Sequence, residues 1–248
     1  MEFLGDVLAW FLDPENWKGP AGIPSRMWEH IQISVVATVA AAAVALPPAL
    51  WLGHRRRGGF VAVAAVNIGR AVPSFAIMAL FLPISIRLGL GLGFWPTLLA
   101  LFALALPPIF TNTYTGVRDV DPALVEAGHG MGMTDGEVLR RIEAPMASPV
   151  ILAALRVSAV QVVATAPLAA LVAWGGLGRY IVDGFAVQDN VRVLAGGVLV
   201  ALLSVTTEIV LGAVEKRVVP KGLTTTEEVI PGAHARTTSL SVARSVSF

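Results

Sequence analysis

Long stretches without charged residues dominate this chain. A helix needs about 20 mainly apolar residues to cross the hydrocarbon core of a bilayer, and five segments meet that requirement. These segments predict membrane spans at about 31–52, 60–83, 95–117, 147–172 and 193–214. Their apolar residues do not alternate with polar ones, which argues against β-strands. The sequence therefore predicts an all-α membrane protein with five transmembrane helices.

Composition narrows the possible functions. Charged residues make up 14% of the 248 residues, against about 25% in soluble proteins. The net charge of +1 gives no basis for a nucleic-acid-binding surface. The sequence has no cysteine, which excludes disulfides and cysteine-based zinc sites. Because no nucleophile–base pair and no cluster of metal ligands appears, we expect no catalytic residue, metal site or cofactor.

Basic residues in the loops predict the orientation in the membrane. One set of loops carries nine of them and the other set carries five, before the distal tail is counted. The richer set comprises Arg55, Arg56, Arg57, Arg118, Arg140, Arg141, Lys216, Arg217 and Lys221. This side should be cytoplasmic, so the N-terminus is expected outside and the C-terminus inside. We expect an extracytoplasmic segment at 1–27 that begins with an amphipathic helix, a transmembrane domain at 28–216 and a mostly disordered tail at 217–248.

The longest cytoplasmic connection, residues 118–145, lies between the third and fourth predicted spans. Its apolar residues recur at roughly helical spacing, and Thr134 and Asp135 are typical of a helix start. We therefore expect two short helices with a turn at about 130–135. The connection also carries a spaced pattern, which reads Glu126-Ala127-Gly128, three residues, Gly132, nine residues, then Ile142-Glu143-Ala144-Pro145.

This pattern resembles the cytoplasmic signature of permeases of binding-protein-dependent ABC importers. Gly128 stands where the signature usually has a second Ala, and Ala144 stands where it usually has Leu. The resemblance implies a five-helix type I importer core whose cytoplasmic loop docks on a separate ATPase. The residues to which it assigns ATPase coupling are Glu126, Ala127, Gly128, Gly132, Met133, Ile142 and Pro145.

A second resemblance is narrower. Four segments are similar to permeases for quaternary-amine osmoprotectants such as glycine betaine, choline and carnitine. They begin at Asn67, Val120, Met131 and Trp174, and the similarity extends from about 28 to 215. It implies inward transport of such a solute across a bacterial-type plasma membrane, after delivery by an extracytoplasmic solute-binding protein.

Energy for this transport is expected to come from partner chains. The sequence has no Gly-x-x-x-x-Gly-Lys-Ser/Thr loop, so ATP hydrolysis is assigned to an ATPase dimer. A single five-span chain is too small to enclose a path in the lipid bilayer, so a second permease chain, identical or paralogous, is expected. Two alternatives stay open, namely an ABC permease for an amino acid or other small solute and an ion-coupled secondary transporter.

Three charged residues lie within predicted spans, namely Arg70, Arg156 and Glu208. Each costs at least about 2.5 kcal/mol at the centre of a bilayer. At a rise of 1.5 Å per residue, all three lie roughly 12–15 Å from the cytoplasmic boundary. We therefore expect Glu208 to pair with Arg156 or Arg70. A structural pair, snorkelling toward the headgroups and a role in gating or substrate contact all remain open.

Polar residues within the spans are candidates for the translocation path. Burying an amide without a partner is expensive, so Asn112 and Gln161 are the first candidates. The full set is Asn67, Arg70, Ser74, Asn112, Arg156, Gln161 and Glu208. Packing between helices is the alternative role for such side chains. His54 and His129 lie near the cytoplasmic face and are expected to be solvated or to take part in docking.

Overall fold

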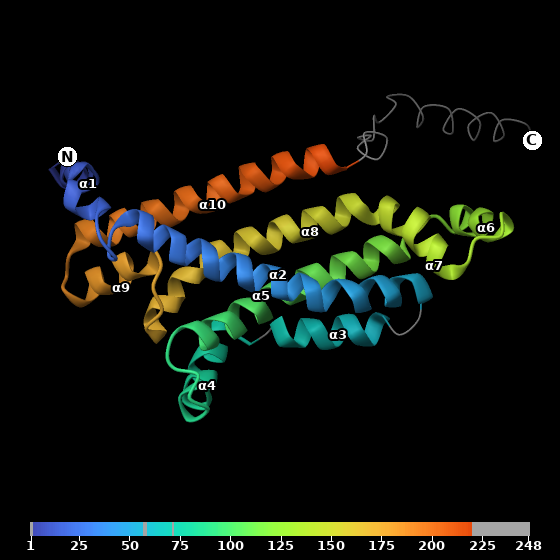
Figure 1. Ribbon diagram of the computed structural model, residues 1–248, viewed down its shortest axis with the longest axis horizontal. Helices are drawn as coiled ribbons and strands as arrows, with labels where there is room; N and C mark the ends of the chain where they lie inside the picture. Colours follow the sequence, from blue (N-terminus) through green and yellow to red (C-terminus); the bar gives the residue numbers. More distant parts are fainter. Residues whose placement is uncertain (1, 57–58, 71, 220–248) are drawn as a thin grey trace, which may run out of the picture.

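The computed structural model describes residues 2–56, 59–70 and 72–219, and these are folded as helices joined by short loops (Figure 1). Within the described residues, four helical segments are long and apolar enough to cross a membrane. They are Ile23–Arg55 (α2), Phe94–Arg118 (α5), Asp135–Val172 and Asn190–Val218 (α10). The third of these consists of Asp135–Val138 (α7), the π-helical Leu139–Glu143 (η2), Ala144–Thr165 (α8) and the 3-10 helix Ala166–Val172 (η3). Four of the five predicted spans thus fall on long apolar helices.

The second predicted span, 60–83, is wrong as a continuous helix. The structure has two helices there, Gly59–Arg70 (α3) and Ser74–Arg87 (α4). At 1.5 Å per residue they are about 18 and 21 Å long, and each is shorter than the bilayer core of about 30 Å. Pro73 explains the break, because proline has no N–H to donate and disfavours helical dihedrals in the residue before it. Figure 1 shows α4 turning away from the direction of α3.

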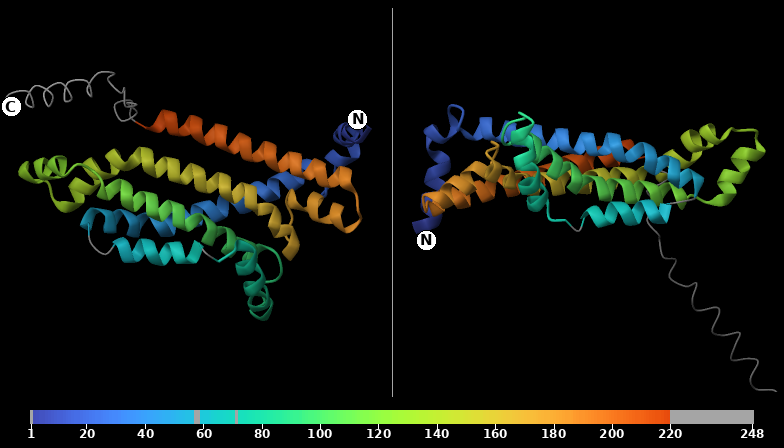
Figure 2. Two further views of the ribbon diagram at one scale, coloured as in Figure 1. Left: turned by 180° about the vertical axis from the view of Figure 1, so that it is seen from behind. Right: turned by 90° about the horizontal axis from the view of Figure 1, so that it is seen from below.

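The long helices share two ends. Pro122–Gly130 (α6) and α7 lie at one end, called the loop end, whereas Glu2–Leu12 (α1) and Gly178–Ala186 (α9) lie at the opposite end (Figures 1 and 2). Helices α2, α5 and α10 all run toward the loop end, and α8 runs away from it. The segment that contains α3 and α4 therefore returns the chain to the start of α5. Helix α10 ends at Val218, inside the predicted tail, and residues 220–248 lie outside the described part of the chain.

A ridge of alanines fixes the central helix pair. From residue 37 to residue 49, every fourth residue of α2 is an alanine with almost no exposed surface, and α5 packs against this ridge. The ridge consists of Ala37, Ala41, Ala45 and Ala49. Small residues at this spacing allow two helix backbones to approach closely. Gly53 extends the ridge, since a Cβ atom there would lie 2.8 Å from Cβ of Val117.

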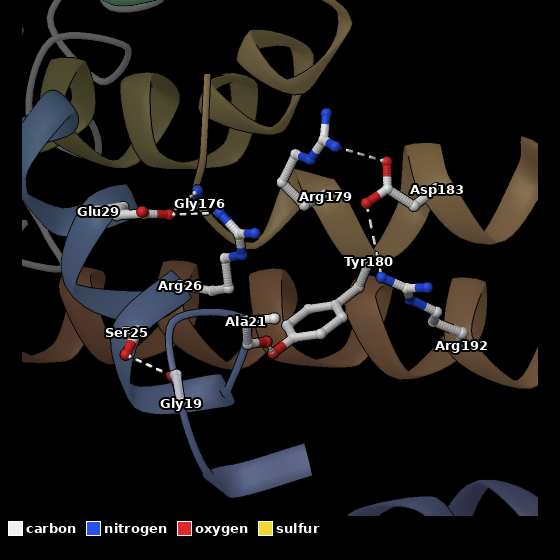
Figure 3. A network of polar contacts seen from close by, with 10 residues as sticks. All are labelled: Gly19, Ala21, Ser25, Arg26, Glu29, Gly176, Arg179, Tyr180, Asp183 and Arg192. Atoms are coloured by element: carbon white, nitrogen blue, oxygen red, sulfur yellow. Dashed lines mark hydrogen bonds and ion pairs between the residues drawn. The ribbon is translucent and has the colours of Figure 1, made fainter. Parts of the chain in front are cut away.

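Polar contacts tie the start of α2 to the loop before α9 (Figure 3). Glu29 accepts a hydrogen bond from the Gly176 N–H over 2.8 Å and pairs with Arg26 over 2.9 Å. Gly175 lies so close that a Cβ atom there would come within 2.0 Å of the Glu29 carboxylate. Gly175 therefore leaves room for the Glu29 side chain.

A second group of contacts joins α9 to its neighbours. Tyr180 donates its hydroxyl to the carbonyl of Ala21 over 2.7 Å, and burial raises the pKa of this phenol, which keeps it protonated as a donor. Asp183 pairs with Arg179 over 3.2 Å and with Arg192 over 3.5 Å (Figure 3). At the opposite end, hydrogen bonds and ion pairs of side chains therefore connect α2, α9 and α10.

We expect Gly175→Ala to destabilise the protein. The added methyl group must displace the Glu29 carboxylate, and the cost is that of losing a charged hydrogen bond, about 1.5–3 kcal/mol. Gly197→Ala is the matched control, because a Cβ atom at Gly197 meets nothing within 4 Å and alanine is favoured in a helix. Thermal unfolding in detergent should show a lower midpoint for Gly175→Ala only. Equal midpoints would contradict the role assigned to Glu29.

Candidate functional site

The connection at residues 118–145 folds into the two short helices that its sequence predicts. At the start of α6, Asp121 accepts a hydrogen bond from the Ala123 N–H over 2.9 Å, and Pro122 occupies the first turn. The turn after α6 contains Gly132 at φ +84°, a conformation that residues with a Cβ atom rarely adopt. At the start of α7, the Glu137 carboxylate accepts hydrogen bonds from the N–H and the hydroxyl of Thr134.

No loop separates α7 from the membrane helix that follows it. The chain passes directly from α7 through η2 into α8. Within η2 the helix widens, because the N–H of Ala144 donates to the carbonyl of Leu139, five residues earlier. Such π-helical segments occur often at functional sites. A displacement of α7 is therefore transmitted to α8 through continuous helical backbone.

Two residues of the signature pattern, Gly128 and Ile142, let α6 pack against α7 and η2. Gly128 is buried, and a Cβ atom there would lie 2.6 Å from Cδ1 of Ile142 and 3.3 Å from Cγ2 of Val138. The glycine that replaces the usual alanine therefore lets α6 approach α7 and η2 closely. The structure gives Gly128 and Ile142 a packing role within the loop, whereas sequence reasoning treated them only as part of a docking surface.

The other signature residues are more accessible. Glu126, Ala127, Gly132 and Pro145 are exposed, and Met133 is half-buried. Next to them, Met131 has 72% of its surface exposed. Between the loop and the end of α2 lies a hollow of about 650 Å³ whose lining includes Glu126 and His129. The loop therefore presents a mixed polar and apolar surface, and docking on an ATPase remains a prediction for these residues.

His54 joins the end of α2 to this loop. Its Nδ1 atom lies 2.5 Å from Oε2 of Glu143, and the side chain of Glu143 is 1% exposed. Of the two roles expected for His54, solvation does not fit, since its own side chain is 15% exposed. The sequence offered little signal, because the two residues are 89 positions apart. Two positions beyond His54, Arg56 donates to the carbonyl of Val120 over 2.9 Å, at the other end of the loop.

The expected pairing of Glu208 with an arginine is present. Arg156 on α8 pairs with Glu208 on α10, and its Nε atom also lies 2.9 Å from Oε2 of Glu215. Sequence reasoning missed Glu215, which it placed beyond the last span, although it lies two turns from Glu208 on the same helix. Arg156 and Glu215 also line an apolar groove of about 440 Å³ between α2, α8 and α10. The side chain of Arg70 lies outside the described part of the structure.

The remaining path candidates lie on four different helices. Asn112 donates its amide to the carbonyl of Pro108 over 2.8 Å and so finds its partner within α5. Asn67 is exposed on α3, Ser74 begins α4 and Gln161 is half-buried on α8. None of these four is among the residues that line the groove between α2, α8 and α10. Their role in a path stays a prediction. In the described residues, no three His, Asp or Glu side chains gather as a metal site would require.

The chain matches a known family over most of its length. A model of the family "Binding-protein-dependent transport system inner membrane component" matches residues 30–220. The choline transport system permease protein OpuBB of Bacillus subtilis (strain 168) is 37% identical over 204 residues, which cover 82% of this chain and 92% of that protein. The glycine betaine/carnitine/choline transport system permease protein OpuCB of the same organism is 38% identical over 201 residues, which cover 81% and 90%.

Solved structures share the fold. A chain of the MetNI methionine ABC transporter in an inward-facing conformation superposes with a TM-score of 0.70 and 20% identity, covering 79% of this chain and 95% of that chain. A second crystal form gives a TM-score of 0.67 at 21% identity. At this level of identity, the likeness extends to the fold alone.

Proposed function

The chain belongs to the family of binding-protein-dependent transport system inner membrane components, and from this membership we propose that it is the membrane subunit of an ATP-driven importer for a quaternary-amine osmoprotectant. The chain itself is a multi-pass transport subunit rather than an enzyme. Its cargo is glycine betaine, choline, carnitine or a similar compound. A separate solute-binding protein delivers this cargo at the extracytoplasmic face.

One observation carries the choice of cargo. Permeases named for choline and for glycine betaine, carnitine and choline align with more than four-fifths of the chain at 37–38% identity. An osmoprotectant import permease of Salmonella typhimurium, OsmW, aligns with 88% of it at 28% identity. The alignments include the membrane helices as well as the cytoplasmic loop, so the likeness is not confined to the signature that importers of many solutes share.

We propose five membrane crossings, with α3 and α4 together forming the second. Helices α2 and α5 both run toward the loop end, and the chain between them must therefore cross back. Together α3 and α4 contain 26 helical residues, which is enough for one crossing. Arg55, Arg118 and Lys216 lie at the loop-end termini of α2, α5 and α10. This distribution supports a cytoplasmic loop end and an external N-terminus.

The proposed mechanism places α6 and α7 of this chain in a groove on one of two ATPase subunits. Closure of the ATPase dimer on ATP moves these helices, and the continuous helix from α7 through η2 carries the movement into α8. A second permease chain, identical or paralogous, completes the path between the two subunits. The solute then crosses by alternating access, in which the helices tilt around a binding site that opens first outward and then inward.

The alternatives differ in their energy source and cargo. An ABC permease for an amino acid has the same fold, as the methionine transporter illustrates. The named relatives of this chain, however, are permeases for choline, glycine betaine and carnitine. A secondary transporter would use an ion gradient and would need no ATPase. The ion pair of Arg156 with Glu208 is compatible with either energy source, so only transport measurements separate them.

Uptake by the reconstituted complex tests the proposed function. The chain is placed in proteoliposomes with its ATPase, its partner permease and its binding protein, and labelled glycine betaine, choline, carnitine and methionine are compared. We expect accumulation of at least one quaternary amine that requires both internal ATP and the binding protein. Preferential uptake of methionine would refute the cargo. Uptake from a cation gradient without ATP would refute the energy source.

A further inference from the structure

Two histidines of α2 contact the long helix formed by η2 and α8 at its two ends. His30 lies near the start of α2, and His54 lies in its last turn. Their partners, Val163 and Glu143, lie near the end of α8 and just before its start. At 1.5 Å per residue, the two contacts are about 36 Å apart along α2 and about 30 Å apart along α8. The contacts thus lie a full membrane thickness apart.

At the loop end, His54 gives the buried carboxylate of Glu143 a hydrogen-bond partner. Glu143 is almost fully buried, and its Oε1 atom has no hydrogen-bond partner in the described part of the chain. Its Oε2 atom accepts a hydrogen bond from Nδ1 of His54. Because an uncompensated carboxylate is costly to bury, this bond favours one position of α2 relative to η2.

The contact at the opposite end uses a backbone group that a proline has left free. In a regular helix the carbonyl of Val163 would accept from the N–H of residue 167, but Pro167 has no N–H. Nε2 of His30 lies 2.9 Å from this carbonyl oxygen and donates to it. The His30 side chain is fully buried. This contact therefore also depends on one relative position of the two helices.

Between the two contacts, the alanine ridge of α2 packs more extensively against α5 than against α8, so this packing does little to hold α2 to α8. Alanines form the α2 ridge, and short side chains provide few projections that interlock with a neighbouring helix. In addition, α2 is separated from the cytoplasmic loop along the chain by α3, α4 and α5. A movement of the loop reaches α8 through continuous backbone, whereas it reaches α2 only through non-covalent contacts.

We propose that His30 and His54 are positioning residues that hold α2 and α8 together as one rigid pair while the cytoplasmic loop moves. This inference rests on the proposed function as an ATP-driven permease, because it concerns how a movement of the loop caused by the ATPase is transmitted to α2. Without the two histidines, α8 would still respond to the ATPase, but α2 would lag behind it. ATP would then be hydrolysed with less solute transported per cycle.

Transport per ATP in the reconstituted complex provides the first test. We expect His30→Leu and His54→Leu to lower uptake per ATP hydrolysed by about tenfold, the factor that corresponds to losing one hydrogen bond to a buried group. Hydrolysis stimulated by the binding protein should persist. Unchanged uptake per ATP, or an equal fall in uptake and hydrolysis in correctly assembled complexes, would overturn the proposal.

Amide substitutions provide a matched control for variants that fail to assemble. The amide nitrogen of Asn can occupy the position of Nδ1, and that of Gln can occupy the position of Nε2. We therefore expect His54→Asn and His30→Gln to keep near-native uptake per ATP, whereas the exchanged pair, His54→Gln and His30→Asn, should not. Equal behaviour of the matched and exchanged amides would show that the ring nitrogens do not act as assigned.

A distance measurement tests the rigid pair without reference to any solute. The chain has no cysteine, so spin labels can be attached at Val44→Cys on α2 and Val157→Cys on α8, both of which are exposed positions. In the complex with its ATPase, we expect the same narrow distance distribution with and without ATP. A shift of several ångströms on adding ATP would overturn the inference. Failure of osmoprotectant uptake alone would instead count against the proposed function.

Discussion

Arg156→Met is expected to destabilise the protein more than other single substitutions of charged residues in the described helices. Arg156 is the cation that faces both Glu208 and Glu215, and methionine would leave two carboxylates near each other on α10. Breaking a buried pair costs about 3–5 kcal/mol, but the Glu208 side chain is 45% exposed, so we expect about 2–3 kcal/mol here. Thermal unfolding of the chain in lipid nanodiscs measures this loss.

A second substitution separates the loss of charge pairing from the loss of packing. Adding Glu208→Gln to Arg156→Met removes one of the uncompensated charges, and the double variant should regain about half of the lost stability. Arg156→Gln, which keeps much of the length but not the charge, should be nearly as unstable as Arg156→Met. If Arg156→Met unfolds at the native temperature, the pair has no structural role. The snorkelling alternative would then be favoured.

Gly128→Phe is expected to abolish uptake while the membrane helices stay folded. Gly128 faces Ile142 at a distance that leaves no room for a large side chain, so phenylalanine would push α6 away from α7 and η2. The accessible residues of the docking surface, such as Glu126 and Met131, would be displaced with α6. Because the clash is confined to the loop, we expect less than about 1% of native uptake with a near-native yield in the membrane.

The companion variants are graded by size. Gly128→Ala should be close to neutral, because the tip of Ile142 can rotate away from one methyl group and alanine favours the helix. Gly128→Leu should impair uptake strongly, and Ile142→Ala in the same chain should restore part of it by making room. Loss of uptake that Ile142→Ala does not relieve would indicate that Gly128 contacts the ATPase directly rather than Ile142.

Hydropathy located the long helices because crossing a bilayer imposes a simple requirement on length and polarity. It did not detect the break between α3 and α4, because an average over 20 residues includes Pro73 without registering its missing N–H. A local rule, that the residue before a proline avoids helical dihedrals, would have placed a boundary at Val72. The same rule has less force at Pro47 and Pro107, where α2 and α5 continue through a pair of prolines.

The pairing of Glu208 with either Arg156 or Arg70 could be predicted from the sequence, because the high cost of an isolated charge in a membrane leaves few alternatives. Two other features could not be predicted in this way. Glu143 precedes the predicted span and looked like a loop residue, so nothing in its sequence neighbourhood indicated burial. Pro167 marks the carbonyl of Val163 as free, but His30 is 133 positions away, and nothing in the sequence indicates which distant donor reaches that carbonyl.

The π-helical segment η2 also has a consequence for how the docking loop is oriented. Each residue of a regular helix turns the chain by about 100°, so one residue added or removed within a helix rotates everything beyond it by that angle. The wider turn at 139–143 therefore determines the rotation of α6 and α7 about the axis of α8. Deleting one residue from this segment would leave α7 and α8 helical but would rotate the loop so that it faces a different direction. The number of residues between Gly132 and Pro145 therefore determines the direction in which α6 and α7 project from α8.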